Sequence, residues 1–87
     1  RHLRCFLAVA EELHFARAAE KLHIEQSPLS RAIKELEEEL GVQLFIRTSR
    51  STRLTLAGKL FLNHVPRVFT AMEQARESVK SAVNGFH

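Results

Sequence analysis

The chain has 87 residues, of which 45% are hydrophobic and 26% charged, so it holds at most one small domain. Thirteen Lys and Arg against ten Asp and Glu give a net charge of +3, which is too small to identify a partner by itself. The apolar content excludes a disordered chain, and one cysteine excludes an intrachain disulfide and a cysteine-based zinc site.

Other classes of protein are also disfavoured. No apolar run is long enough to cross a bilayer and no signal-peptide pattern is present, so a cytoplasmic location without membrane contact is expected. The five histidines lack close ligand spacing, and no metal site is expected. The chain starts without Met and ends without a clear stop, which indicates a fragment. One core is only marginally sufficient at this size, which favours self-association.

The first expected helix covers residues 2–12. Leu3, Phe6, Leu7 and Ala10 lie on one stripe of this segment. Cys5 is expected to pack there as a small hydrophobe.

Two further helices are expected on either side of a short turn at residues 23–25. In both segments apolar residues recur every three or four positions. They are Phe15, Ala18, Ala19 and Leu22 in the first segment, and Leu29, Ile33, Leu36 and Leu40 in the second. Ile24 is expected to fill the corner between the helices. This spacing predicts a helix-turn-helix on a three-helix core.

The second helix of this pair is polar at its start and acidic at its far end. Ser27 is its expected N-cap, Pro28 fits its first turn, and Gly41 fits the position after its end. Arg31 and Gln26 have the side chains that bind guanine and adenine in a bidentate manner, which predicts that the start of the helix faces DNA. Four glutamates within residues 35–39 are expected to face away from phosphate. The alternative is an ordinary helical hairpin with solvated polar residues.

A β-hairpin is expected after Gly41. Residues 42–46 and 54–56 have strand character, and residues 47–53 form a polar loop with Arg47, Arg50 and Arg53 spaced by threes. A hairpin that follows a helix-turn-helix is a wing, and its arginines can reach phosphates or a narrow minor groove. The alternative is a solvated surface loop.

The last expected helix is capped by Thr55 and runs from near Leu56 to about Val83. Its apolar residues alternate in steps of four and three, the pattern of a coiled-coil seam. They are Phe61, Val65, Val68, Met72, Ala75, Val79 and Ala82. The seam predicts a homodimer, and the alternative is that it covers the domain's own core. Pro66 is expected to kink or open this helix.

Taken together, the residues resemble the N-terminal region of the LysR-type transcriptional regulators. The match covers nearly the whole chain and rests on residues 2–4, 6, 18–22, 26, 29–31, 33, 36–37, 40–41, 44–45, 47, 54–55 and 57–58. The resemblance implies a mainly α fold: a winged helix-turn-helix of three helices and a two-stranded wing over residues 1–57, then a dimerisation linker helix over 58–87. It also implies antiparallel linker pairing, tetramers, and a C-terminal effector domain outside this chain that binds a small-molecule inducer. No cofactor is expected in the chain itself, and RNA polymerase is a possible further partner.

The resemblance also assigns roles to residues. Base contacts are implied for Gln26, Ser27, Pro28, Ser30 and Arg31, and a minor-groove contact for Arg50. Phosphate contacts are implied for Arg17 and Lys34 in the helix pair and for Arg47, Thr48, Ser49 and Arg53 in the wing.

Two departures from the family pattern stand out. Glu25-Gln26-Ser27 replaces a common Ser-Gln-Pro, so a carboxylate lies near the duplex, where it can repel phosphate, favour the helix dipole or accept from a cytosine amine. His14 and Ala16 replace hydroxyl residues that often cap the first helix of the pair and touch phosphate.

The leading interpretation is a bacterial transcriptional regulator that reads an interrupted palindrome in double-stranded DNA. A second is a protein-interaction module in which the long helix binds the partner. An enzyme is the third, and no catalytic residues are assigned because no nucleophile stands beside a base.

Overall fold

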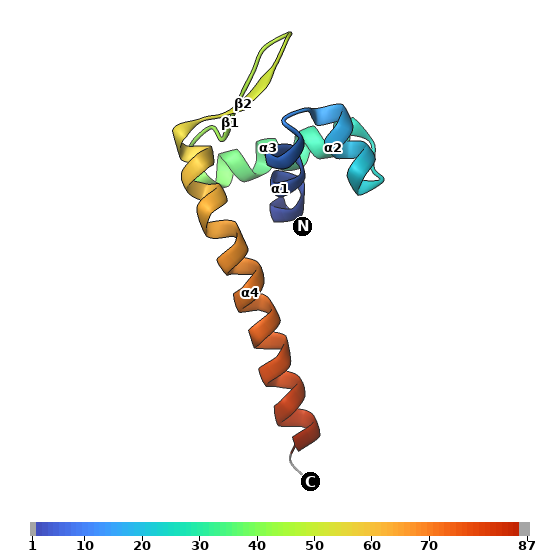
Figure 1. Cartoon of the computed structure of the whole chain (residues 1–87), viewed down its shortest axis with the longest axis vertical. Coiled ribbons are helices and arrows are strands. Elements are labelled where there is room, and N and C mark those ends of the chain that lie inside the picture. The colour runs from blue at the N-terminus through green and yellow to red at the C-terminus, as the bar shows by residue number, and fades with distance from the viewer. Residues whose placement is uncertain (1, 86–87) are drawn as a thin grey trace.

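The computed structural model describes residues 2–85, and the side chains of residues 2–83. Its elements are α1 (His2–Glu12), α2 (Phe15–Leu22), α3 (Gln26–Leu40), β1 (Phe45–Arg47), β2 (Thr52–Leu54) and α4 (Leu56–Gly85). Figure 1 shows α1, α2, α3 and the hairpin gathered at one end, with α4 extending away from them. The molecule is therefore elongated, with extents of 59 × 27 × 20 Å.

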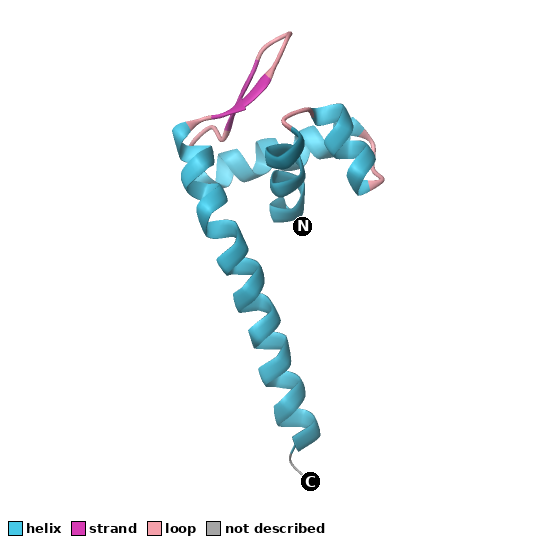
Figure 2. Cartoon of the chain, in the orientation of Figure 1, coloured by secondary structure: helices cyan, strands magenta, loops and turns pink. Residues whose placement is uncertain are grey.

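The secondary structure matches the expected class. Figure 2 shows a mainly helical chain whose strands are confined to the one hairpin. The prediction of a three-helix unit, a two-stranded wing and a long final helix is confirmed. Residues 86 and 87 of the predicted linker helix, and residue 1, lie outside the described residues.

The core lies where α1, α2 and α3 meet the start of α4. The largest side chains with less than 2% exposure are Phe6, Leu29, Leu44, Val9 and Val65. Ala18 and Ala19 are buried on α2, where small residues allow two helix axes to approach closely. Cys5 is also buried, as expected.

The corner between α2 and α3 is made by backbone hydrogen bonds. His23 has a left-handed φ of 58°, and the next N–H, that of Ile24, donates to the carbonyl of Ala19 at 3.0 Å. The prediction that Ile24 fills the corner is wrong, since 40% of this residue is exposed. Its main chain terminates α2 while its side chain stays outside the core.

Helix α3 begins at Gln26, two residues earlier than an N-cap at Ser27 would allow. The N-cap is Glu25, whose side chain makes no capping hydrogen bond, so the prediction of Ser27 as N-cap is wrong. Pro28 still falls in the first turn, where its missing N–H removes no helical bond. Gly41 ends the helix at a φ of 72°, which glycine adopts without strain and which confirms its predicted place.

Glu37 holds the turn after α3 against the helix. Its carboxylate accepts the N–H of Leu44 at 2.7 Å and that of Phe45 at 3.3 Å. Glu37 therefore stabilises the fold through these hydrogen bonds, whereas its neighbours Glu38 and Glu39 are exposed.

The wing strands are shorter than predicted and displaced along the chain. The register pairs Phe45 with Leu54 and Arg47 with Thr52. The predicted strands at 42–46 and 54–56 are wrong in their bounds, because the turn before Phe45 is bonded to α3 and the chain after Leu54 is already committed to capping α4.

Thr55 joins the wing to α4. Its hydroxyl donates to the carbonyl of Gln43 at 2.6 Å and accepts the N–H of Gly58 at 2.9 Å, which confirms the predicted cap. Its own N–H donates to the carbonyl of Leu44 at 3.0 Å. These bonds fix the direction in which α4 leaves the domain.

The first turns of α4 belong to the core. Val65 is 1% exposed, and Phe61, Leu62 and Phe69 pack against the same cluster. The core thus continues beyond residue 57, the predicted end of the DNA-binding unit. Pro66 lies inside the helix, which continues on both sides as one element.

We expect Gly58→Ala to destabilise the fold. A Cβ at this position would overlap the carbonyl oxygen of Leu44 and come within 2.9 Å of a methyl carbon of Leu54. Backbone cannot yield as a flexible side chain can, so the free energy of unfolding should fall by about 1–3 kcal/mol. Urea unfolding followed by circular dichroism measures it.

Gly41→Asn is the matched control. A Cβ there meets nothing within 4 Å, and Asn tolerates the left-handed conformation better than other residues. Equal stability of Gly58→Ala and Gly41→Asn would contradict the close packing at Gly58.

Candidate nucleic-acid interface

The start of α3 presents a polar surface because the apolar residues of its first three turns face inward. Leu29, Ala32, Ile33 and Leu36 are buried in the core. Gln26, Ser27, Pro28, Arg31 and Lys34 are exposed, and Ser30 is half-buried. The predicted base-reading residues therefore share one surface, with Ser30 set deepest.

Glu25 lies at the edge of this surface. It is exposed, and its carboxylate is not used to cap the helix. A negative charge beside a helix N-terminus is favoured by the helix dipole. The carboxylate therefore stays available beside Gln26.

The tip of the wing is a closed turn. The N–H of Thr48 donates to the carbonyl of Ser51 at 2.8 Å, and its hydroxyl accepts the N–H groups of Ser51 and Arg50 at 3.0 and 3.3 Å. This places Ser49 and Arg50 at the end of the hairpin, both exposed. The hydroxyl of Thr48, predicted to contact phosphate, is thus occupied in shaping the turn.

The three wing arginines differ in their surroundings. Arg50 is at the tip, and Arg53 lies opposite Ile46 on β2. The guanidinium carbon of Arg47 lies 3.8 Å from the centre of the Phe15 ring. Sequence reasoning missed this contact, since a spacing of three gives no sign of which arginine meets an aromatic ring.

A groove separates the wing from the starts of α2 and α3. It measures about 300 Å³, and its lining includes His14, Gln26 and residues 47–52. One face of the groove thus belongs to residues 13–16 and Gln26, and the other to the wing. A second groove of about 490 Å³ runs between α3 and β1, with Ser30 and Lys34 on its wall.

His14 caps α2, although it stands where the family often has a hydroxyl residue in this role. Its Nδ1 accepts the N–H of Arg17 at 3.2 Å, which caps α2. The side chain of Arg17 is left exposed at the start of α2, in keeping with its predicted phosphate contact.

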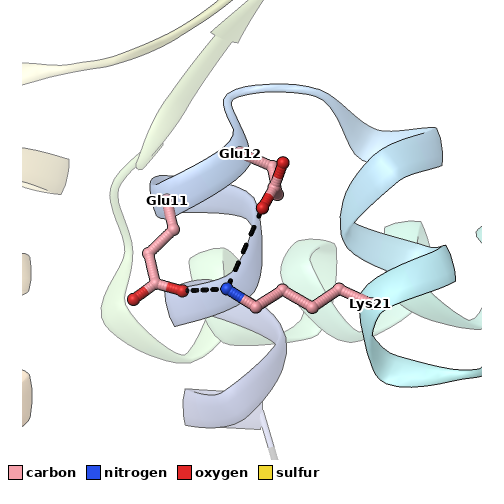
Figure 3. Close-up of polar contacts among 3 residues, drawn as sticks. All are labelled: Glu11, Glu12 and Lys21. Atoms are coloured by element: carbon pink, nitrogen blue, oxygen red, sulfur yellow. Dashed lines mark hydrogen bonds and ion pairs between the residues drawn. The ribbon is translucent and has the colours of Figure 1, made fainter.

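Lys21 is a cation that serves the fold instead of this surface. Its Nζ lies 2.6 Å from Glu11 and 3.8 Å from Glu12, which joins the ends of α1 and α2 (Figure 3). The side-chain hydrogen bond to Glu11 raises the pKa of Lys21 above its ordinary value.

Exposed apolar residues continue along α4 beyond the domain. Val68, Met72 and Val79 are 40%, 53% and 64% exposed, and Ala75 and Ala82 are also exposed. The predicted seam needs correction at its other end, because Val65 is buried and Phe61 half-buried in the chain's own core. A spacing of four and three cannot tell packing within a chain from packing between chains.

Leu56 and Leu60 are apolar residues of α4 that the predicted seam left out. They are 73% and 55% exposed. They lie outside the steps of four and three that begin at Phe61. At this end of α4 the exposed apolar residues are therefore Leu56 and Leu60, and the seam residues Phe61 and Val65 pack in the core.

Residues 2–85 contain no cluster of three or more His, Cys, Asp or Glu side chains suited to a metal. In the same range, no helix has the length and apolarity needed to span a membrane.

Comparison with known proteins gives consistent matches. The family model "Bacterial regulatory helix-turn-helix protein, lysR family" matches residues 1–59. The HTH-type transcriptional regulator AlsR of Bacillus subtilis is 49% identical over 85 residues, 98% of this chain and 28% of that protein. XapR of Escherichia coli, also an HTH-type transcriptional regulator, is 62% identical over 66 residues, 76% of this chain and 22% of that protein. The chain thus spans about a quarter of such relatives.

Solved structures agree with this assignment. The protein chain of a CbnR_DBD–DNA complex superimposes with a TM-score of 0.90 and 37% identity over 97% of both chains. That of a BenM_DBD/catB site 1 DNA complex gives a TM-score of 0.84 and 44% identity, over 97% of this chain and 94% of that one. With a family model that covers more than half of its residues, this chain belongs to the lysR family of bacterial regulatory helix-turn-helix proteins.

Proposed function

We propose that this chain is the DNA-binding part of a bacterial transcriptional regulator and binds double-stranded DNA as a homodimer. The observation that carries the proposal is the groove bordered by Gln26 of α3 on one side and the wing tip with Arg50 on the other. A helix start and a hairpin tip placed in this way can enter a major groove and the adjacent minor groove. The DNA complexes of CbnR and BenM support the proposal.

Each part of the interface has a separate task. Gln26 and Arg31 read base edges through bidentate hydrogen bonds, helped by Ser27, Pro28 and Ser30. Arg50 enters the minor groove, whose negative potential is strongest where it is narrow. Contacts to phosphate fix the register and release counterions. They are assigned to Arg17, Lys34, Ser49 and Arg53.

The exposed stripe on α4 supplies the dimer contact. Met72, Ala75 and Val79 border one apolar surface there, with the stems of Arg76 and Lys80 at its edge. Burying such a stripe against a second copy removes apolar area from water. Antiparallel pairing of two α4 helices would place the DNA-binding heads at opposite ends of the pair.

The rest of the regulator lies outside this chain. Because relatives such as AlsR are more than three times as long, we assign to the remainder an effector domain that binds a small-molecule inducer and supports tetramers. No catalytic step and no cofactor is assigned to residues 1–87. Because a regulator that binds chromosomal DNA must be in the bacterial cytoplasm, we assign it to that compartment, where it can also contact RNA polymerase.

Fluorescence anisotropy on labelled duplexes tests DNA binding directly. We expect tighter binding to a duplex with an interrupted T-to-A palindrome than to a scrambled duplex, with affinity falling steeply as salt rises. Each phosphate contact contributes about 0.9 to the slope of log affinity against log salt. No binding to either duplex at low salt would refute the proposal.

Substituting Arg31 separates base reading from attraction to phosphate. Arg31→Ala should cost roughly 1–3 kcal/mol at the contacted base pair and relax preference there, because the bidentate pairing is lost. Competition binding with palindromes varied at single positions measures it. Lys34→Ala is the control, one turn along the same exposed face and assigned to phosphate. An equal loss on all duplexes for Arg31→Ala would contradict the base-reading role.

A charge on the α4 stripe should weaken the dimer. Val79→Asp puts two carboxylates into the proposed interface without a large change in helix propensity, so the dimer dissociation constant should rise at least about tenfold. Analytical ultracentrifugation measures it. Gln74→Asp, outside the stripe, is the control and should leave the dimer intact. A dimer unaffected by Val79→Asp would place the interface elsewhere.

A further inference from the structure

Arg47 is the last residue of β1, where the hairpin leaves the domain. Its guanidinium carbon lies 3.8 Å from the centre of the Phe15 ring, within the range of a cation–π contact. Phe15 is the first residue of α2 and is 5% exposed. The contact therefore connects the outer part of the wing to the helix that supports α3.

The Phe15 ring is a fixed platform. It meets the Phe45 ring edge-on, with centres 6.1 Å apart and an interplanar angle of 74°. Phe45 in turn lies 5.4 Å from the ring of Phe6, which is fully buried. A side chain that stacks on Phe15 is thus held in a fixed position relative to the centre of the core.

The wing needs such an attachment. Its strands have three residues each, and a lone two-stranded hairpin is at best marginally stable in water. Ile46 and Arg53, the pair before Arg47, are both exposed. Beyond Phe45 and Leu54 the apolar core gives the hairpin little support, and the tip bonds at Thr48 are internal to the turn.

We propose that Arg47 is a positioning residue: its stack on Phe15 sets the angle of the wing against α2 and α3, and thereby places Arg50 at the minor groove. The inference rests on the proposed DNA binding and replaces the phosphate contact predicted for Arg47. A planar guanidinium suits this task, because it stacks on a ring face in a way that a compact ammonium does not.

Three variants separate the planar guanidinium from its charge. Arg47→Gln removes both, Arg47→Lys keeps the positive charge but loses the planar guanidinium, and Arg53→Gln is the matched loss of one charge from the opposite strand. We expect Arg47→Gln and Arg47→Lys each to lose about two- to five-fold affinity on a palindrome with A·T-rich flanks and little on one with G·C-rich flanks. Arg53→Gln should keep the flank preference.

The alternative role gives the opposite results. If Arg47 binds phosphate, Arg47→Gln should weaken binding on both flanks and lower the salt slope by about 0.9, and Arg47→Lys should restore both. Rescue by Lys, or a loss of flank preference in Arg53→Gln, would overturn the proposal.

A double-mutant cycle tests whether Arg47 acts through Arg50. Because Arg50→Ala removes the side chain that Arg47 is proposed to place, Arg47→Gln should cost almost nothing in that background. Losses that add fully would show that Arg47 contributes independently of Arg50 and would also overturn the proposal.

A DNA-free measurement keeps this inference apart from the proposed function. In the NMR spectrum of the free chain, the side-chain protons of Arg47 should be shifted upfield by the Phe15 ring, and backbone signals of residues 48–51 should move in Arg47→Lys. Unshifted Arg47 protons would contradict the stack even if the chain binds DNA. A parent chain that binds no duplex would refute the proposed function while leaving the measured stack intact.

Discussion

The arrangement of this domain depends on the main chain of Leu44. Its N–H is bound by the carboxylate of Glu37 from α3, and its carbonyl accepts the N–H of Thr55 at the start of α4. Gly58 packs directly on that carbonyl, and the Leu44 side chain is fully buried. Leu44 thus holds together the end of α3, the base of the wing and the start of α4. Their relative orientation is set by hydrogen bonds to the main chain of Leu44 and by its buried side chain, not by the exposed side chains.

Aromatic rings extend this arrangement to the wing. Phe6 contacts both Phe45 and Phe61, which connects α1 to the hairpin and to α4. Phe15 adds the contact from Phe45 to the guanidinium of Arg47. The start of α3 is therefore built on the core, while beyond Phe45 and Leu54 the wing meets the domain through the contact of Arg47 with Phe15. On the proposed roles of these residues, affinity and flank preference could be altered separately.

Periodicity was enough to predict the helices, the hairpin and the surface of α3, because the burial of one helical face leaves the other exposed. It failed where two kinds of partner satisfy the same pattern. Val65 fits a seam between chains as well as a core within one, and only the burial decides. Ser27 is a favoured N-cap residue type, but the helix begins at Gln26, and Glu25 occupies the N-cap position without a side-chain cap. The stack of Arg47 on Phe15 joins residues 32 positions apart, beyond the reach of local spacing.

The closed turn at the wing tip has a consequence for which of its residues can be changed. Thr48, Arg50 and Ser51 bond to one another, so the tip carries its own hydrogen-bond closure independently of the core. The side chains of residues 49 and 50 can therefore be changed without loss of this closure, provided that Thr48 and Ser51 are kept.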